Sequence, residues 1–530
     1  MAQAHLSIVL HAHLPYVRHP EHVYHLEENW FYEAMHETYL PLLQMLRRLD
    51  AQSVPGRLTL SVSAPLFSMM NDAMLTERFN VHLDRLIVLA KSEIVRTQGD
   101  DVYLPLAHFY LERFETMKRF YVDELGCDVI SELRRQHAAG RIELITCVGT
   151  HPILPFLATS GGRRAQVKAA CDLFEQTFGF RSKGIWLAEC AFSPGMDRFL
   201  AEEGISFTFV EENAIENADS KPVYGNFAPL ISEHDVAFFG RDQIASAQVW
   251  SASEGYPGDF DYREFYRDIG FDLELDYILP FIHPDGIRHN TGLKYHRITG
   301  EVALGDKQPY NSELAYQRAW DHAAHFIDAR AAQAGELANY MEERPVHMTC
   351  PYDSELFGHW WFEGPIFLEG LFHRAAENAA VVMSTPVDYL EQVTVHQKTT
   401  PATSTWGEAS YFNVWLDESN AWIYRHMRNA ETLMTELADE FKDAEGLEER
   451  ALRQTGRELL LAQSSDWPFI IKTGTTVAYA VQRIEEHIEN IKTLAGQIRG
   501  HAIDEAFIAK LEAKNNIFPQ LDWQSWADNS

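Results

Sequence analysis

Two carboxylates stand out because each follows a short apolar run and lies among aromatic side chains. Glu189 follows residues 184–188, and Asp353 lies in the stretch 350–361 after the apolar run 346–349. A carboxyl group with so few polar neighbours has a raised pKa or is reserved for chemistry on a bound ligand. One such residue is explained equally well as a salt-bridged glutamate at a strand end. Two of them favour an acid and a nucleophile that face one sugar ring.

Three histidines also follow apolar runs. His11 and His13 come at the end of the first run, and His151 comes after a later one. In an extended segment alternate side chains share a face, so His11 and His13 point towards one ligand. With His151 as a third ligand they would suit a metal ion. Imidazoles that bond sugar hydroxyls explain the same spacing equally well, and a third interpretation is that local backbone groups satisfy them.

The elements that position these residues are short apolar strands with polar residues at their carboxyl ends. The strands are predicted at Leu6–Leu10, Leu58–Val62, Ile142–Thr146 and Phe207–Val210. Helical stretches separate them, which is typical of a parallel α/β barrel or sheet with one functional face.

Two regions interrupt this alternation. Residues 67–140 have a helical pattern without a strand, which predicts a helical insertion, and the strands disappear after residue 397. Apolar residues then recur at helical spacing. We therefore predict a catalytic barrel formed by residues 1–66 and 141–396, a helical insertion domain at 67–140, and a helical C-terminal domain at 397–530.

Composition limits the partners. The chain has 530 residues and a net charge of −32, which excludes nucleic acid and anionic membranes as partners because both need a basic surface. A neutral polysaccharide remains compatible. Aromatic residues make up 12 %, which suits either sugar stacking or a well-filled core.

The cysteines and the N-terminus bear on the cellular compartment. Five cysteines without a CxxC pair indicate neither a disulfide framework nor a zinc–thiolate site. The first apolar run, Leu6–Leu10, is too short for a signal peptide or a membrane span. We therefore expect a cytoplasmic protein, and we expect it to be a monomer.

Four motifs together resemble the conserved regions of glycoside hydrolase family 57, most closely its 1,4-α-glucan branching enzymes. They are His11–Tyr16, the stretches around Glu189 and Asp353, and Ala462–Phe469. The resemblance implies an α/β fold: a distorted (β/α)7 barrel with a helical insertion and an all-α C-terminal domain that contributes to the cleft. It also implies an α-glucan substrate, with neither a metal nor a cofactor. The resemblance therefore favours substrate binding as the role of His11 and His13.

The same resemblance implies a retaining double displacement, with Glu189 as nucleophile and Asp353 as general acid/base. Retention requires the two carboxyl groups to be about 5 to 5.5 Å apart. Glu355, two residues beyond Asp353, shares its face in an extended segment. Only the resemblance therefore selects Asp353 as the acid.

Further substrate-binding residues are predicted around this pair. Tyr256 lies in the turn-rich segment 250–259, which is either a lid over the site or an ordinary surface loop. Trp406 and Trp415 suit stacking on glucose, whereas Trp422 is predicted to lie in the core. The remaining predicted binding residues are His151, Trp360 and Asp466, of which Asp466 is also explained as a residue near a helix N-cap.

Other functions share parts of this pattern. An α-amylase or a 4-α-glucanotransferase of the same family would have the same catalytic pair. A metal-dependent polysaccharide deacetylase would use His11, His13 and a carboxylate around a metal. A non-catalytic glucan-binding protein would keep the tryptophans without needing both Glu189 and Asp353.

Overall fold

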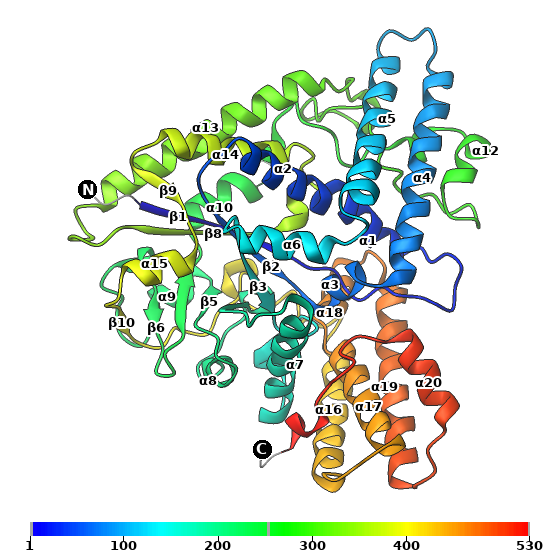
Figure 1. Ribbon diagram of the computed structural model, residues 1–530, viewed down its shortest axis with the longest axis vertical. Helices are drawn as coiled ribbons and strands as arrows, with labels where there is room; N and C mark the ends of the chain where they lie inside the picture. The colour runs from blue at the N-terminus through cyan, green and yellow to red at the C-terminus, as the bar shows by residue number, and fades with distance from the viewer. Residues whose placement is uncertain (1–3, 252–254, 528–530) are drawn as a thin grey trace.

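A curved β-sheet forms the centre of the computed structural model, which describes residues 4–251 and 255–527 (Figure 1). Its strand order is β10-β6-β7-β5-β4-β3-β2-β1-β8, with β9 also paired to β1. The strands are β1 (Ala4–Ala12), β2 (Leu58–Val62), β3 (Ile142–Cys147), β4 (Gly184–Trp186), β5 (Phe207–Val210), β6 (Leu230–Ile231), β7 (Ala237–Gly240), β8 (His347–Asp353), β9 (Val381–Met383) and β10 (Gln397–Lys398).

The strands predicted from apolar runs are present as β1, β2, β3 and β5. Every residue of β1, β2 and β3 is buried. This is expected of parallel strands covered by helices on the outside and packed against one another on the inside. Continuous apolar runs therefore predicted these strands correctly.

The sheet closes into a distorted barrel through a small contact between β7 and β8. Arg241, just beyond β7, forms a parallel bridge with Thr349 of β8. The backbone N–H of Asp242 also donates to the Thr349 carbonyl at 2.8 Å. Together with the parallel pairing of β1 to β5, β7 and β8, this contact completes a ring of seven strands and confirms the expected fold class.

Helices surround the barrel and extend from it (Figure 1). Within the barrel part and its insertion they are α1 (Glu28–Ala34), α2 (Leu40–Ala51), α3 (Ala64–Met70), α4 (Ala73–Arg96), α5 (Tyr103–Arg119), α6 (Val129–Ala138), α7 (Ser160–Phe178), α8 (Asp197–Glu202), α9 (Glu212–Glu216), α10 (Gln243–Trp250), α11 (Ile269–Asp272), α12 (Leu275–Ile278), α13 (Ser312–Leu337), α14 (Gly364–Glu377) and α15 (Pro386–Gln392). A π-helical turn, η1 (Met35–Tyr39), joins α1 to α2. Helices α4 and α5 pack together as a long hairpin that projects from the barrel.

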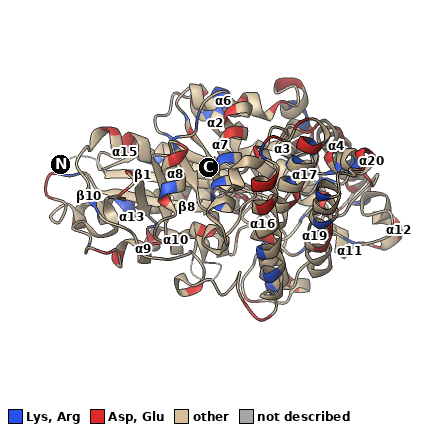
Figure 2. Cartoon of the chain, turned by 90° about the horizontal axis from the view of Figure 1, so that it is seen from below, with Lys and Arg blue, Asp and Glu red and all other residues tan. Residues whose placement is uncertain are grey.

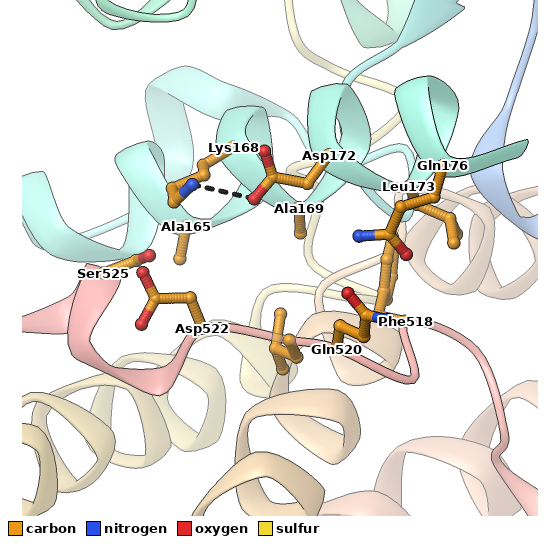
Figure 3. Close-up of a pocket in the computed structure, with 11 residues that line it drawn as sticks. Ala165, Lys168, Ala169, Asp172, Leu173, Gln176, Phe518, Gln520, Asp522 and Ser525 are labelled. Carbon is orange, nitrogen blue, oxygen red and sulfur yellow. Dashed lines mark hydrogen bonds and ion pairs between the residues drawn. The ribbon is translucent and has the colours of Figure 1, made fainter. Parts of the chain in front are cut away.

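The C-terminal part is helical, in the region where strands were predicted to end. Its helices are α16 (Trp422–Glu440), α17 (Leu447–Ala462), α18 (Asp466–Thr473), α19 (Val477–Arg499) and α20 (Glu505–Lys514). The final described segment runs back along α7, and Figure 3 shows residues from Phe518 to Ser525 facing one side of that helix. The chain end thus ties this helical part to the barrel.

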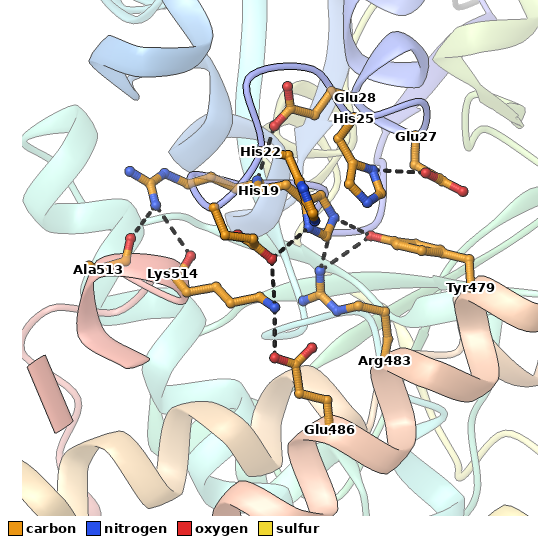
Figure 4. Close-up of polar contacts among 12 residues, drawn as sticks. His19, His22, His25, Glu27, Glu28, Tyr479, Arg483, Glu486, Ala513 and Lys514 are labelled. Atoms are coloured by element: carbon orange, nitrogen blue, oxygen red, sulfur yellow. Dashed lines mark hydrogen bonds and ion pairs between the residues drawn. The ribbon is translucent and has the colours of Figure 1, made fainter. Parts of the chain in front are cut away.

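A histidine-rich loop between β1 and α1 makes a second connection to the C-terminal helices (Figure 4). The imidazole of His19 lies 2.8 Å from the Tyr479 hydroxyl of α19. Glu21 pairs with Lys514 of α20 at 2.8 Å. The barrel and the C-terminal helices therefore share a polar interface at this loop.

Charge is distributed over much of the molecule. Figure 2 marks Asp and Glu residues in red on helices of both parts, α15 and α16 among them. Within the described residues, no helix combines the length and apolarity needed to cross a membrane.

Candidate active site

The carboxyl ends of the barrel strands bring the predicted residues together. His11 lies in β1 and is paired in register with Asp353, the last residue of β8. Glu189 lies in a short turn three residues beyond β4. Parallel strands end at the same edge of a sheet, which is why sites separated widely in sequence meet here.

Glu189 and Asp353 line one open cleft with a volume of about 810 Å³. This volume is in the range of small-molecule binding sites. Aromatic side chains form much of the wall. They are Trp250, Phe265, Tyr266, Trp360, Trp406, Trp415 and Phe469.

Glu189 is held by residues from beyond the barrel. The indole N–H of Trp406 donates to Glu189 Oε2 at 2.7 Å, and the Ser465 hydroxyl donates to Oε1 at 3.3 Å. Burial raises the pKa of Glu189 to about 7, while the Trp406 hydrogen bond opposes this shift and the charge of Asp353 adds to it.

The backbone at this position is strained. Glu189, Cys190 and His151 have φ angles of 60°, 50° and 67°, in the left-handed region that side chains with a Cβ rarely adopt. Such a conformation costs about 1 to 3 kcal/mol per residue and is concentrated at functional sites.

Asp353 has a different electrostatic environment. Its pKa is raised to about 8, mainly by burial and also by the carboxylate of Glu355, while Arg241 opposes the shift. Glu189 thus accepts two hydrogen bonds, which favour its ionised form, whereas Asp353 has a second carboxylate nearby, which favours its protonated form.

The three histidines form a stacked layer behind Glu189. His11 Nε2 lies 3.0 Å from His151 Nε2, and His151 Nδ1 lies 2.8 Å from the Ser465 hydroxyl. Burial lowers the pKa of both His11 and His151 well below the usual range. Neutral imidazoles have one donor and one acceptor nitrogen. The chain of hydrogen bonds from His11 through His151 and Ser465 to Glu189 fits that state.

His13 connects to the C-terminal helices. Its Nε2 lies 3.0 Å from Asp466 Oδ2, at the first residue of α18, and its Nδ1 lies 2.8 Å from the Ser63 hydroxyl. Burial would raise the pKa of Asp466, but the His13 imidazole holds it below the usual range. Ligand atoms of His13, His151 and Asp466 lie within 4.8 Å of one another, whereas the predicted metal ligands His11, His13 and His151 do not form such a group among the described residues. The hydrogen bond between His13 and Asp466 already joins two of them.

Residues 7–402 match the family model described as glycosyl hydrolase family 57. The chain belongs to that family. Residues 426–526 match a second model, described as the C-terminal part of 1,4-alpha-glucan branching enzyme.

Relatives of this family 57 protein include enzymes with two activities. A 1,4-alpha-glucan branching enzyme of Thermococcus kodakarensis is 31 % identical, over 97 % of this chain and 77 % of that protein. A probable 1,4-alpha-glucan branching enzyme of Mycobacterium tuberculosis is 28 % identical, over 94 % of this chain and 93 % of its own length. The crystal structure of the alpha-amylase AmyC from Thermotoga maritima superimposes with a TM-score of 0.93 at 37 % identity and covers 100 % of both chains.

A solved branching enzyme is also similar. The crystal structure of the family 57 branching enzyme from Thermococcus kodakaraensis has a TM-score of 0.89 at 29 % identity, over 99 % of this chain and 97 % of that one.

The tryptophans of this family 57 chain differ in exposure. Trp360 is 53 % exposed and stacks on Phe265 with ring centroids 4.5 Å apart, so its free face is open to the cleft. Trp415 reaches the cleft wall but is only 2 % exposed. The prediction that Trp422 lies in the core was wrong, because this residue begins α16 and is 40 % exposed. A helix-start position leaves its indole at the surface.

Tyr256 is packed against α13. Its hydroxyl lies 2.7 Å from His325 Nδ1, and its ring stacks on His322 at 4.7 Å. Its neighbours Pro257 and Gly258 line the cleft. Residues 252–254 of the predicted lid lie outside the described residues. A role for Tyr256 in substrate binding stays a prediction, as does that of the histidines and Asp466.

Arg241 was missed at the sequence level. It lines the cleft, its guanidinium lies over the Trp406 ring at 5.9 Å, and it pairs with Glu211 at 3.2 Å. The signal was present, because residues 236–239 are an apolar run and Gly240 and then the charged Arg241 follow it. That run is strand β7, which shows the same pattern as the predicted strands.

Proposed function

We propose that the protein is a 1,4-α-glucan branching enzyme, which cleaves an α-1,4 linkage and transfers the chain to a glucan 6-hydroxyl by a retaining double displacement. The observation that carries this proposal is the match to branching enzymes along both parts of the chain, the barrel and residues 426–526. The cleft with two carboxyl groups and aromatic walls supplies the chemistry that this reaction needs.

Glu189 is the proposed nucleophile and Asp353 the proposed general acid/base. Burial is the main cause that raises the pKa of both carboxyl groups; the Trp406 hydrogen bond favours the ionised form of Glu189, and the neighbouring Glu355 carboxylate favours the protonated form of Asp353. The ionised Glu189 attacks the anomeric carbon while Asp353 protonates the departing 4-oxygen. Asp353 then removes the proton from the acceptor hydroxyl, which displaces Glu189 from the anomeric carbon. A separation of about 5 to 5.5 Å between the two carboxyl groups is expected for this mechanism.

The choice between branching and hydrolysis depends on the acceptor. Water is far more concentrated than any sugar hydroxyl, so a transferase must shield the covalent intermediate. Trp360, Trp406 and the turn at Pro257 and Gly258 border the cleft and are the elements proposed to exclude water.

Hydrolysis is the second candidate function. The observation that favours it is the 37 % identity to the alpha-amylase AmyC from Thermotoga maritima, across the full length of both chains. An amylase would share the carboxyl pair and differ only in admitting water to the intermediate.

Proton NMR of amylose incubated with the purified protein separates the two candidates. New α-1,6 anomeric signals with few new reducing ends are expected. Reducing ends without α-1,6 signals would establish a hydrolase. Glu189→Gln is the control and should give neither product.

We also propose that the enzyme works as a monomer in the cytoplasm. All five cysteines are free and four of them are buried, as expected for a protein kept in a reducing compartment. Light scattering at catalytic concentration tests the monomer, and fractionation of the source cells tests the location.

A further inference from the structure

A second carboxylate follows Asp353 in the same turn and has no role in the mechanism above. Asp353 ends β8, and Glu355 lies in the short turn Ser354–Leu356 directly after it. Burial raises the pKa of Glu355 to about 7, against the effect of its hydrogen bonds. A half-buried carboxylate beside a proposed acid needs a physical explanation.

The contacts of Glu355 join three elements at the cleft. Its Oε1 accepts a hydrogen bond from the backbone N–H of His13 at 3.3 Å, just beyond β1. The same oxygen accepts a hydrogen bond from the hydroxyl of Tyr39, the last residue of the π-helical turn η1. The carboxylate thus connects the end of β8 to β1 and to η1.

The π-helical turn holds both ends of the segment after Asp353. Tyr39 contacts Glu355, and Glu37 of the same turn pairs with His359 at 2.7 Å. Gly358, between them, packs so closely that a Cβ there would lie 1.9 Å from the Glu37 carbonyl oxygen. Residues 355–359 are therefore seated on η1, and a π-turn is common at functional sites.

The charged groups around Asp353 come from several elements. Glu355 is the nearest carboxylate along the chain, and Arg241 beyond β7 is the opposing cation. Glu189 faces Asp353 across the cleft, and the Tyr39 hydroxyl faces it from η1. His13 approaches Glu355 through its backbone and Asp466 through its imidazole. Of these groups, Glu355 is the one placed to oppose Arg241.

We propose that Glu355 is a positioning residue: it seats the turn after β8 on β1 and η1, and its charge makes Asp353 retain the proton that the leaving oxygen requires. The proposal rests on the proposed function, because it takes Asp353 as the acid. A like charge nearby favours the protonated form of a carboxyl group. The Tyr39 and His13 donors stabilise the charge on Glu355 and thus maintain its effect.

Glu355→Gln tests the charge while keeping an acceptor oxygen for both donors. Without the negative charge Asp353 loses its proton at lower pH, so the basic limb of kcat/KM on amylose should move down by about one unit. Above the limb this corresponds to about tenfold lower kcat/KM than wild type. With α-maltosyl fluoride, whose leaving group needs no proton, kcat/KM should stay within about twofold of wild type. A merely structural role would lower both.

The chain offers a closely matched control. Glu363 is a buried carboxylate whose Oε1 accepts from the Tyr310 hydroxyl at 2.6 Å and from the backbone N–H of Arg263 at 3.1 Å. It thus has the same kinds of donor as Glu355, away from Asp353. Glu363→Gln should leave the basic limb in place.

Tyr39→Phe keeps Glu355 and gives a second test if Glu355→Gln fails to fold. The Tyr39 hydroxyl favours the ionised form of Glu355. Its loss makes Glu355 hold its proton to higher pH, so the basic limb should again move down. A basic limb that stays in place in either folded variant, in an enzyme whose wild type acts on amylose, would overturn this proposal alone. A wild type inactive on amylose would overturn the proposed function instead.

Discussion

The indole N–H of Trp406 donates to the Glu189 carboxylate at 2.7 Å, from a segment 217 residues away in the chain. The backbone N–H of Trp406 also donates to the Glu189 backbone carbonyl at 3.0 Å. The proposed nucleophile is therefore held at both its side chain and its backbone by one residue from outside the barrel strands.

Trp406→Phe should move the acidic limb of kcat/KM to higher pH. The hydrogen bond favours the ionised form of Glu189, so its loss raises the pKa of the group that must be ionised to attack. A shift of about one unit would lower kcat/KM about tenfold on the acidic side. Steady-state rates across pH measure this.

Trp415→Phe is the matched control for that variant. Within the described residues the buried Nε1 of Trp415 has no hydrogen-bond partner. Replacing the Trp415 indole should therefore leave the acidic limb of kcat/KM in place. Equal shifts in both variants would mean that the limb reports packing and not the hydrogen bond to Glu189.

Azide should distinguish the nucleophile from the general acid/base, because each variant should form a different glycosyl azide. Glu189→Ala should lose at least about 10⁴-fold in kcat, because the covalent step is gone. With α-maltosyl fluoride and azide it should form the β-glycosyl azide by a single displacement. Asp353→Ala should lose about 10²- to 10⁴-fold on amylose and form the α-glycosyl azide through the covalent intermediate. Proton NMR of the anomeric protons identifies the α- and β-glycosyl azides. An α-azide from Glu189→Ala and a β-azide from Asp353→Ala would reverse the assignment of the two roles.

Stability should fall as pH falls below about 6.5. Burial, Arg483 and His25 lower the pKa of His19, so this imidazole stays neutral in the folded protein. The unfolded chain takes up that proton below its normal pKa of about 6.5. Each such histidine therefore lowers the free energy of unfolding by about 1.4 kcal/mol per pH unit below that value.

Urea unfolding between pH 7 and 5 measures this slope. His19→Gln should make it shallower by the contribution of one histidine. His22→Gln removes an exposed imidazole from the same loop and is the control. An unchanged slope in His19→Gln would show that the interface in Figure 4 does not contribute to acid sensitivity.

Metal removal should leave activity intact. His13, His151 and Asp466 are near enough to share an ion. The double displacement, however, needs only two carboxyl groups, as nucleophile and as acid/base, and no metal ion. Dialysis against a chelator, followed by elemental analysis and the NMR assay, tests this. Lost activity restored by one divalent metal would show that the reaction on amylose depends on a bound ion and would contradict this prediction.

Local patterns predicted the parts of the site that lie on single strands. The runs before Glu189 and Asp353 are β4 and β8, and both carboxyl groups line one cleft as expected. Apolar strands are recognisable because buried parallel strands need continuous apolar residues. Strand β7 has the same pattern, and Arg241 after it was therefore predictable.

Long-range packing was not predictable in the same way. The sequence near Tyr256 indicates a turn, but the contact of its ring with His322 depends on where α13 lies. The donors of Glu189 come from residues 406 and 465, far along the chain. No local spacing encodes such distances, and only the resemblance to a known family pointed to the last motif.

The order of elements along the chain means that the active site is completed late in synthesis. Both side-chain donors to Glu189, Trp406 and Ser465, come after every strand of the barrel. During synthesis the barrel can assemble with its proposed nucleophile still incomplete. An unfinished or truncated chain lacks both donors to Glu189 and the part of the cleft wall that Trp406 forms, so a complete active site is expected only after the C-terminal helices have folded onto the barrel.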